Sequence, residues 1–378
     1  MSRPGSALGR WLSAQARARE DAGLTRALRP RPPHADAVDL AGNDYLGLAT
    51  DPRVSAAAAE AARVWGAGAG ASRLVTGTLD LHVDLERALA GFCGQAAALL
   101  FSTGYHANLG AVTALSDDDT LIVSDAHVHA SLVDACRLAR GRVHVVPHGD
   151  LGAVAAALSE RAESRALVLC ESVYSVLGDA APLAALVRLC RRHDATLVVD
   201  EAHALGVVGP RGAGSVASLG LADDEHVVVT LTLSKSLGSQ GGAVLGSAPL
   251  VEHLVNRSRP FIFDTGLAPA AAGGALEALR IVAAEPELPA RARDCAAALA
   301  DAVEVDVPAG AVLSVPMPGP REALAAQQEL ADHGLRVGCF RPPSVPDQVS
   351  RLRLTASARL GAPELDEVAA VLTKVVVG

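Results

Sequence analysis

The sequence predicts an α/β fold, with a large doubly wound domain followed by a smaller α+β domain. Between about residues 97 and 246, apolar runs of strand length alternate with helical patterns, which is typical of a parallel sheet with helices on both faces. The runs are continuous in Val and Leu, as expected of strands that are buried on both sides. With 378 residues, 50% of them hydrophobic, the chain is long enough for a large core and a second, smaller one.

The elements are expected in the following order. In the first part of the chain, the residue pattern predicts an Ala- and Arg-rich helix over 7–29, a strand and turn over 38–48, and helices over 53–65 and 79–92. Seven strand-length runs come next: AALLFS, DTLIVSD, GRVHVVPH, ALVLCESV, TLVVDEAH, HVVVTLTLS and GGAVLG. The helices between them are expected over 107–115, 129–140, 151–162 and 181–193.

The pattern changes past about residue 275. An Ala-rich helix over 267–283 leads into weaker strand runs, GAVLSVPM and SRLRLTAS, with helices over 320–333 and 363–376. We therefore expect an N-terminal helix and arm over 1–45, a large α/β domain over 46–275, and a small C-terminal α+β domain over 276–378.

Composition excludes several classes of function. A net charge of -9, a pI near 5.7 and an aromatic content of 3% disfavour a nucleic-acid surface. The six cysteines form no C-x-x-C pair or zinc-site spacing, so we expect no metal and mostly buried, reduced thiols. The N-terminus has no signal-like apolar stretch, and no run approaches the roughly 20 apolar residues of a membrane helix. These features predict a cytoplasmic protein.

Polar residues gather where five of the predicted strands end. Ligands of open α/β sheets bind beyond the carboxyl ends of the strands, so this convergence carries more weight than any single motif. The residues are Ser102 to Tyr105, His127 and His129, Glu171 and Ser172, Asp200 and His203, and Thr232 to Lys235.

Lys235 stands out because small residues surround it in LTLSKSLGSQGG. A partly desolvated lysine loses proton affinity and becomes a nucleophile, and a Schiff base with an aldehyde cofactor is its natural use. Pyridoxal phosphate (PLP) is the prime candidate. A surface lysine at a turn is the alternative on this residue alone.

Asp200 and His203, in VVDEAHALG, strengthen the cofactor interpretation. An aspartate at the end of a buried strand needs a positive partner, and a pyridinium N–H is one. His203 is then expected to bond the ring hydroxyl. A capping aspartate and a space-filling histidine remain the structural alternative.

The segment FSTGYHAN lies between a strand and a helix, where backbone N–H groups can bind phosphate. We expect Gly104 and Tyr105 to supply them, with the Thr232 hydroxyl, and His129 to stack on a flat ring. A plain helix cap is the alternative. GAGAGAS superficially matches a dinucleotide fingerprint, but no strand precedes it.

Taken together, the motifs resemble the α-oxoamine synthase family of PLP enzymes, which has the type I aminotransferase fold. The resemblance rests on NDYLGL, GAGASRLVTG, HVDLE, STGYHAN, HVHASLVDACRL, SVYSVLGDAAPL, VDEAHALGVVG, TLSKSLGSQGG, RPFIFDTGLAPA and RPPSVP…SRLRLTAS, and covers nearly the whole chain.

The resemblance implies specific roles. Lys235 is the Schiff-base lysine and the general base, Asp200 pairs with the pyridine nitrogen, and His129 stacks on the ring and acts in catalysis. The other implied cofactor contacts are His203, Ser172, Gly104, Tyr105, Thr232 and Thr265, the last from a neighbouring subunit, so a homodimer with shared sites is implied. The implied substrate contacts are Arg26, Asn43, His129, Ser344 and Arg353.

Within the family, FRPPSVP points to the branch that condenses L-alanine with a pimeloyl thioester, carried by CoA or acyl carrier protein, in biotin biosynthesis. Two departures, Leu177 in SVLGD and Leu360 in TASARL, leave the substrate detail open. The alternatives are a glycine C-acetyltransferase, a non-catalytic partner subunit of the same fold, and an NAD dehydrogenase.

Overall fold

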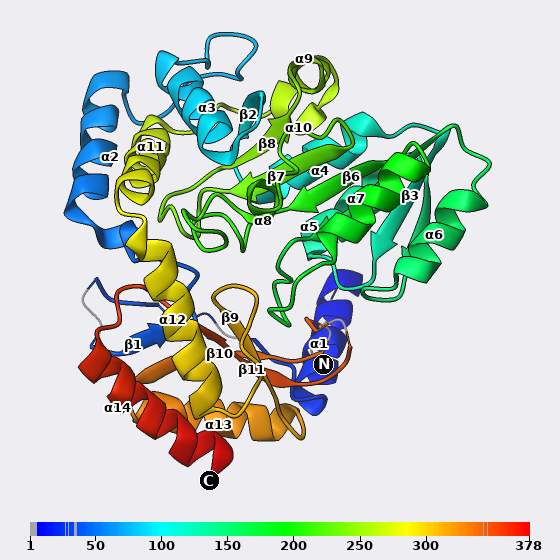
Figure 1. The fold of residues 1–378 in the computed structure, drawn as a ribbon. Coiled ribbons are helices and arrows are strands. Elements are labelled where there is room, and N and C mark those ends of the chain that lie inside the picture. The colour runs from blue at the N-terminus through cyan, green and yellow to red at the C-terminus, as the bar shows by residue number, and fades with distance from the viewer. Residues whose placement is uncertain (1–5, 27, 29, 34–35, 343, 346) are drawn as a thin grey trace.

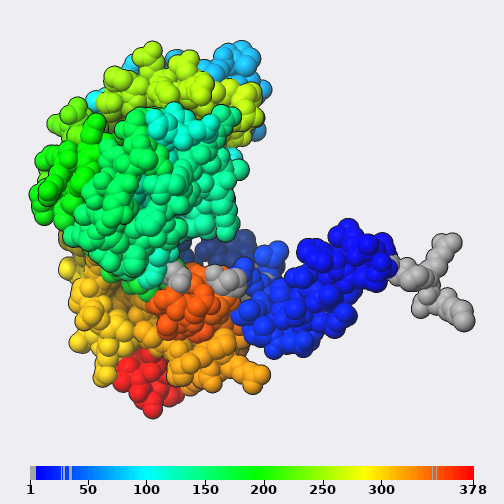
Figure 2. All heavy atoms as spheres, turned by 90° about the vertical axis from the view of Figure 1, so that its right-hand side faces the viewer, coloured from blue at the N-terminus to red at the C-terminus, as the bar shows by residue number. Residues whose placement is uncertain are grey.

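The protein folds into two lobes, with an N-terminal helix that projects beside them (Figures 1 and 2). A computed structural model describes residues 6–26, 28, 30–33, 36–342, 344–345 and 347–378. Pro343 and Pro346, which belong to the FRPPSVP motif, lie outside the described residues. Figure 2 shows the larger lobe above the smaller one, with the N-terminal segment extending away from both.

A seven-stranded sheet forms the centre of the larger lobe, in the order β2-β8-β7-β6-β5-β3-β4. β8 runs opposite to the other six strands, which all point the same way. Asp200 and Lys235 therefore follow adjacent parallel strands, and their side chains can meet at one edge. The strands are β2 (Ala97–Phe101), β3 (Thr120–Asp125), β4 (Arg142–Val146), β5 (Arg165–Glu171), β6 (Thr196–Asp200), β7 (Val227–Thr232) and β8 (Gly242–Gly246).

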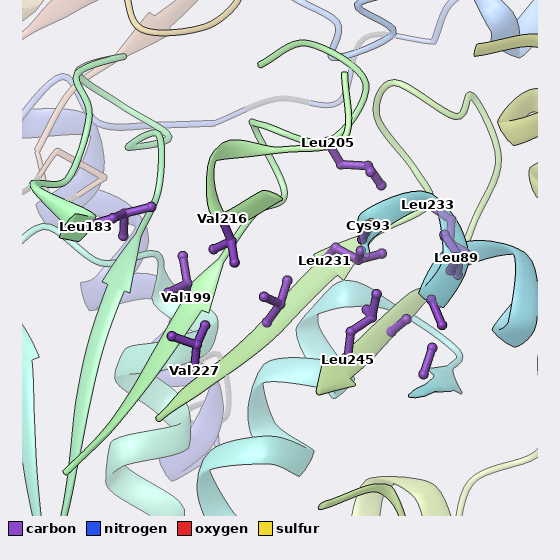
Figure 3. Close-up of a cluster of buried hydrophobic side chains, with 14 of the residues drawn as sticks. Leu89, Cys93, Leu183, Val199, Leu205, Val216, Val227, Leu231, Leu233 and Leu245 are labelled. Carbon is purple, nitrogen blue, oxygen red and sulfur yellow. The ribbon is translucent and has the colours of Figure 1, made fainter. Parts of the chain in front are cut away.

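Helices cover both faces of this sheet, because alternate strand residues point to opposite sides. Val199 and Val227 pack into one core, drawn in Figure 3, while Val198 and Val228 pack into another. The first core contacts α3 (Asp80–Cys93), α6 (Leu151–Ser159), α7 (Leu183–Arg192), α8 (Ser215–Ser218) and α11 (Pro269–Ala284). The second contacts α4 (Gly104–Leu115), α5 (Ala130–Leu138), α9 (Ala248–Arg257) and α10 (Arg259–Ile262).

The smaller lobe is built on a four-stranded sheet in the order β1-β10-β11-β9. Its first strand, β1 (Val38–Leu40), comes from the N-terminal segment and pairs in parallel with β10 (Leu335–Phe340). The other strands are β9 (Val312–Pro316) and β11 (Arg351–Thr355), and the helices are α12 (Glu287–Ala302), α13 (Pro320–Asp332), α14 (Ala362–Leu372) and a π-helical turn, η2 (Thr373–Val377).

The N-terminal segment differs from its expected form. The predicted helix over 7–29 is wrong in length, because α1 (Ala7–Asp21) ends eight residues earlier. Gly23 has a φ of 65°, which a right-handed helix cannot continue through, and the chain then turns back as Leu24 N donates to Arg19 O. A short η1 (Leu48–Thr50) and α2 (Pro52–Trp65) follow β1 and lead into the larger lobe.

The expected fold class and all seven strand runs are confirmed. All six cysteines are free thiols, and five of them are buried. In the described part of the chain, no helix has the length and apolarity that a membrane crossing requires.

Candidate active site

A cleft of about 710 Å³ opens between the two lobes, at the carboxyl ends of the strands of the larger sheet. The larger lobe contributes His129, His203 and Lys235, and the smaller lobe contributes Phe340, Ser344 and Arg353. The N-terminal segment adds Arg26 and Asn43. Seven residues predicted from the sequence thus line one cavity: Arg26, Asn43, His129, His203, Lys235, Ser344 and Arg353.

Lys235 lies in the loop after β7, and its Nζ is 2.7 Å from His203 Nε2. Burial lowers the pKa of the lysine to about 8, against the opposing effect of Asp200 and Glu171. Burial and the Lys235 charge hold the pKa of His203 well below its usual value. The histidine is therefore neutral, and its Nε2 can accept from the lysine. Lys235 is therefore deprotonated far more readily than an exposed lysine, as nucleophilic attack requires.

Asp200 ends β6 and is buried, with 6% of its surface exposed. Asn108 Nδ2 donates to its Oδ2 at 2.7 Å, and Ala202 N donates to its Oδ1 at 2.8 Å. Neither donor carries a charge, so the carboxylate retains the capacity to pair with a cationic group. Ser172 is buried beside it, and its backbone N donates to Asp200 O at 2.9 Å.

His129 is the N-cap of α5, and its Nδ1 accepts from the backbone N–H of Ser131. The Ser131 hydroxyl lies 2.7 Å from the same nitrogen. Desolvation in the cleft lowers the pKa of His129, so the ring is neutral at pH 7. The imidazole is thereby fixed at the cleft wall, in a position suited to stacking on a planar ligand.

The start of α4 forms a cradle of backbone N–H groups. Thr103 caps the helix by accepting from His106 N, while the N–H groups of Gly104 and Tyr105 lie in the first turn, where a helix offers no backbone acceptor. A Cβ on Gly104 would come within 2.8 Å of Thr232 Cβ, so only glycine allows this approach. Tyr105 turns its hydroxyl outward, to Asp134 Oδ2 at 2.5 Å.

Arg353, on β11, brings the smaller lobe to the cleft. Its Nε donates to Ser175 O at 2.7 Å, and both terminal nitrogens lie 3.2 Å from Asn43 Oδ1. Glu171 holds the Ser175 backbone in place, because its carboxyl accepts a hydrogen bond from Ser175 N at 3.0 Å. Burial raises the pKa of Glu171 to about 8. The guanidinium is held by neutral acceptors and keeps its charge for an anionic ligand.

The remaining predicted residues lie farther from the lysine. Arg26 is exposed and donates to the Ser344 hydroxyl, which links the N-terminal segment to the loop after β10. Thr265 is exposed and pairs with Ser72 in an isolated bridge, outside the lining of the cleft. Its neighbour Asp264 accepts a hydrogen bond from the Ser102 hydroxyl, which precedes the α4 cradle.

Sequence reasoning missed two buried polar residues. Tyr45 is fully buried and links His203 Nδ1, at 2.7 Å, to Asn43 Oδ1, at 3.0 Å. Asn108 is 3% exposed and contacts Asp200. Both residues belong to motifs that the sequence analysis quoted, NDYLGL and STGYHAN. A polar side chain within such a buried segment needs hydrogen-bond partners, and this requirement could have identified both.

Comparison with known proteins agrees with this geometry. The family "Aminotransferase class I and II" matches residues 35–372. Two 8-amino-7-oxononanoate synthases are close relatives: that of Mycobacterium marinum is 56% identical over 97% of this chain and 95% of its own, and that of Mycolicibacterium gilvum is 54% identical over 99% of both. The chain belongs to the 8-amino-7-oxononanoate synthase branch of the class I and II aminotransferase family.

Solved structures extend the agreement to the cofactor. A structure of serine palmitoyltransferase with PLP superposes with a TM-score of 0.91, at 30% identity and 98% coverage of both chains. The chain has the type I fold of PLP-dependent transferases and is a PLP-dependent enzyme, as the sequence resemblance implied.

The residues present fit this cofactor. A buried carboxylate without a charged donor suits a pyridinium nitrogen, and a lysine with a lowered pKa suits an aldehyde. The N–H groups of Gly104 and Tyr105 suit a phosphate. Asp200, Lys235 and the α4 cradle would hold the ring nitrogen, the aldehyde carbon and the phosphate, respectively.

Proposed function

We propose that the chain catalyses the decarboxylative condensation of L-alanine with a pimeloyl thioester, releasing 8-amino-7-oxononanoate, CO2 and the free thiol carrier, in biotin biosynthesis. The observation that carries this proposal is the 54–56% identity to synthases of that name over nearly the whole chain. The cleft supports it, because Lys235, His129 and Arg353 line one cavity.

Each residue has a separate task in this reaction. PLP, when bound, supplies the electron sink that makes the Cα proton of the amino acid acidic. Arg353 binds the alanine carboxylate with its guanidinium fork, in place of the Asn43 carbonyl that it contacts here. Lys235 Nζ removes the Cα proton, since its lowered pKa leaves it partly unprotonated at neutral pH.

The other residues bind the acyl donor or stabilise the charge on the cofactor ring. His129 presents a neutral imidazole that donates a hydrogen bond to the thioester carbonyl oxygen. Asp200 keeps the ring nitrogen protonated from its buried position. Arg26, Asn43 and Ser344 line the side of the cleft where the acyl group is proposed to bind.

We further propose a homodimer with shared sites, in which Thr265 contacts the cofactor phosphate of the second copy. Its exposure supports this, as does the exposed apolar face of α1. The free, mostly buried thiols support a cytoplasmic location. The domain limits at about residues 45 and 275 also remain proposals.

The test is thiol release by the PLP-loaded protein, with pimeloyl-CoA and L-alanine compared with acetyl-CoA and glycine. We expect a preference of at least about 100-fold in kcat/KM for the first pair, equivalent to about 2.7 kcal/mol of transition-state binding. Preference for the second pair would assign the chain to the acetyltransferases. PLP binding without turnover of either pair would indicate a non-catalytic subunit.

A further inference from the structure

A buried amide, that of Asn108 on α4, connects three elements beneath the cleft. Its Nδ2 lies 2.7 Å from Asp200 Oδ2 and 2.8 Å from Ser131 Oγ, and its Oδ1 accepts from Thr230 Oγ1 at 2.6 Å. All four residues are buried. A buried amide is costly unless each of its polar atoms is hydrogen-bonded, and here each one is.

The donors and acceptors fix the orientation of this amide. The Asp200 carboxylate offers only acceptors, so the NH2 group of Asn108 faces it. The second N–H of the same group then points to Ser131 Oγ, and the carbonyl accepts from Thr230. A flipped amide would place two acceptor oxygens 2.7 Å apart, which is strongly unfavourable.

This orientation determines the direction of the next hydrogen bond. Because the Ser131 oxygen accepts from Asn108, its own proton is available for His129 Nδ1, 2.7 Å away. The Ser131 backbone N–H also points at that nitrogen, and a backbone N–H can only donate. His129 Nδ1 therefore carries no proton, and the proton of the neutral ring lies on Nε2.

We propose that Asn108 is a positioning residue that sets two catalytic groups at once: it orients the Asp200 carboxylate directly and fixes His129 as the Nε2–H tautomer through Ser131. The ring then turns a donor, rather than an acceptor, toward the cleft. The inference rests on the proposed function only for the roles of Asp200 and His129. The tautomer of His129 follows from hydrogen bonds within the chain and needs no substrate or cofactor.

The decisive variant is Asn108→Asp, which keeps the size of the side chain and replaces its donor by an acceptor. The Ser131 hydroxyl would then donate to residue 108 and leave a lone pair toward His129 Nδ1. The new carboxyl would also share a proton with Asp200, as adjacent carboxyls do. Ser131→Ala removes the hydroxyl that links Asn108 to His129 but keeps the hydrogen bond between Asn108 and Asp200, whereas Thr230→Val removes a hydrogen bond from the Asn108 carbonyl and leaves both of its donors in place.

The tautomer is measured by 15N NMR of histidine-labelled protein prepared without cofactor, with His129→Gln assigning one signal among the twelve histidines. The Ser131 backbone N–H still favours Nε2–H in every variant, so we expect a pure Nε2–H signature in the unaltered protein and in Thr230→Val. A measurable minor Nδ1–H population should appear in Asn108→Asp and Ser131→Ala, where the hydroxyl no longer donates to Nδ1. The PLP dissociation constant, from absorbance titration, should rise about tenfold or more in Asn108→Asp alone, since only that variant places a second carboxyl beside Asp200.

An unchanged His129 signal in both Asn108→Asp and Ser131→Ala would overturn the proposal, and so would an equal change in Thr230→Val. If Asn108→Asp does not fold, Ser131→Ala decides alone. Failure of the proposed reaction is a separate result, because neither the tautomer nor PLP affinity depends on a thioester substrate.

Discussion

Tyr45 shows how a single hydroxyl can connect the two ends of the cleft. It donates to Asn43 Oδ1, which Arg353 contacts, and lies 2.7 Å from His203 Nδ1, whose other nitrogen contacts Lys235. Because the hydroxyl proton goes to Asn43, His203 Nδ1–H donates to the Tyr45 oxygen. This leaves Nε2 as the acceptor that faces the lysine.

Replacing Tyr45 by Phe should therefore weaken amino-acid binding more than turnover. The change leaves His203 Nδ1 unpaired in the core and frees Asn43 from its position beside Arg353, at a cost in stability of about 1–2 kcal/mol. We expect KM for L-alanine to rise about tenfold, corresponding to about 1.4 kcal/mol, with kcat lowered less. Steady-state kinetics measure the split.

Tyr174→Phe is the matched control, since Tyr174 is also buried but its ring contacts His148. It should lower stability to a similar extent without changing this KM. An unaltered KM in Tyr45→Phe would show that Asn43 and Arg353 hold their positions without the hydroxyl.

His148 provides a pH-dependent contribution to stability. Its Nδ1 and Nε2 lie 2.9 and 2.8 Å from Asp125 and Asp179, and these contacts, Asp125 foremost, raise its pKa from 6.5 to about 9. Since the folded pKa exceeds the unfolded one, the stabilisation is fully present below about pH 6.5 and is lost as the pH rises through about 9.

His148→Gln should thus lower the denaturant midpoint at pH 6 by an amount equivalent to about 2 kcal/mol, with the difference closing by about pH 9. Urea unfolding at pH 6, 7.5 and 9 measures it. His144→Gln, on the exposed edge strand β4, should leave all three midpoints unchanged. A deficit in His148→Gln that stayed constant across this range would mean that packing against His127, and not charge, is what His148 contributes.

At the scale of elements, strands with continuous Val and Leu runs could be predicted because burial on both faces dictates their composition. β10 was missed because Gly338 interrupts its apolar pattern. α12 was missed because Pro289 suggests a break, although it lies in the first turn, where a missing N–H costs nothing. The strand-end residues of the site were predictable, whereas Tyr45 and Asn108 act through partners 158 and 92 residues away.

The contact between α4 and β7 gives a test at this scale. Gly104→Ala places a methyl group 2.8 Å from Thr232 Cβ, so the start of α4 must move away from the strand. We expect PLP affinity to fall about tenfold or more as the backbone donors shift, with a stability loss of about 1–3 kcal/mol from overpacking. Absorbance titration measures the affinity.

Gly91→Ala, on α3, is the control, because a Cβ there meets nothing within 4 Å. It should leave PLP binding unchanged and slightly favour the helix. Equal affinities in the two variants would show that the cradle tolerates displacement of α4.

At the scale of the whole molecule, α1 is the helix whose apolar face is exposed. None of its residues is buried, and Leu8, Trp11 and Leu12 are 63%, 58% and 52% exposed on one face at i, i+3 and i+4. The helix projects from both lobes (Figure 2), so none of the residues that the structure describes covers that face. An amphipathic helix of 15 residues is marginal alone in water, and a second copy of the chain is the cover that the proposed dimer provides.

The double variant Trp11→Ser with Leu12→Ser should therefore weaken self-association. Removing two large apolar contacts from an interface costs about 2–4 kcal/mol, which raises the dimer dissociation constant by about 30-fold or more. Sedimentation velocity across a concentration series measures it. Arg17→Ala changes the opposite face of the helix, about 180° from Leu8, and should leave the constant unaltered. If the double variant sediments as the unaltered protein does at every concentration, α1 lies outside the dimer interface. Its apolar face must then be covered by some other partner.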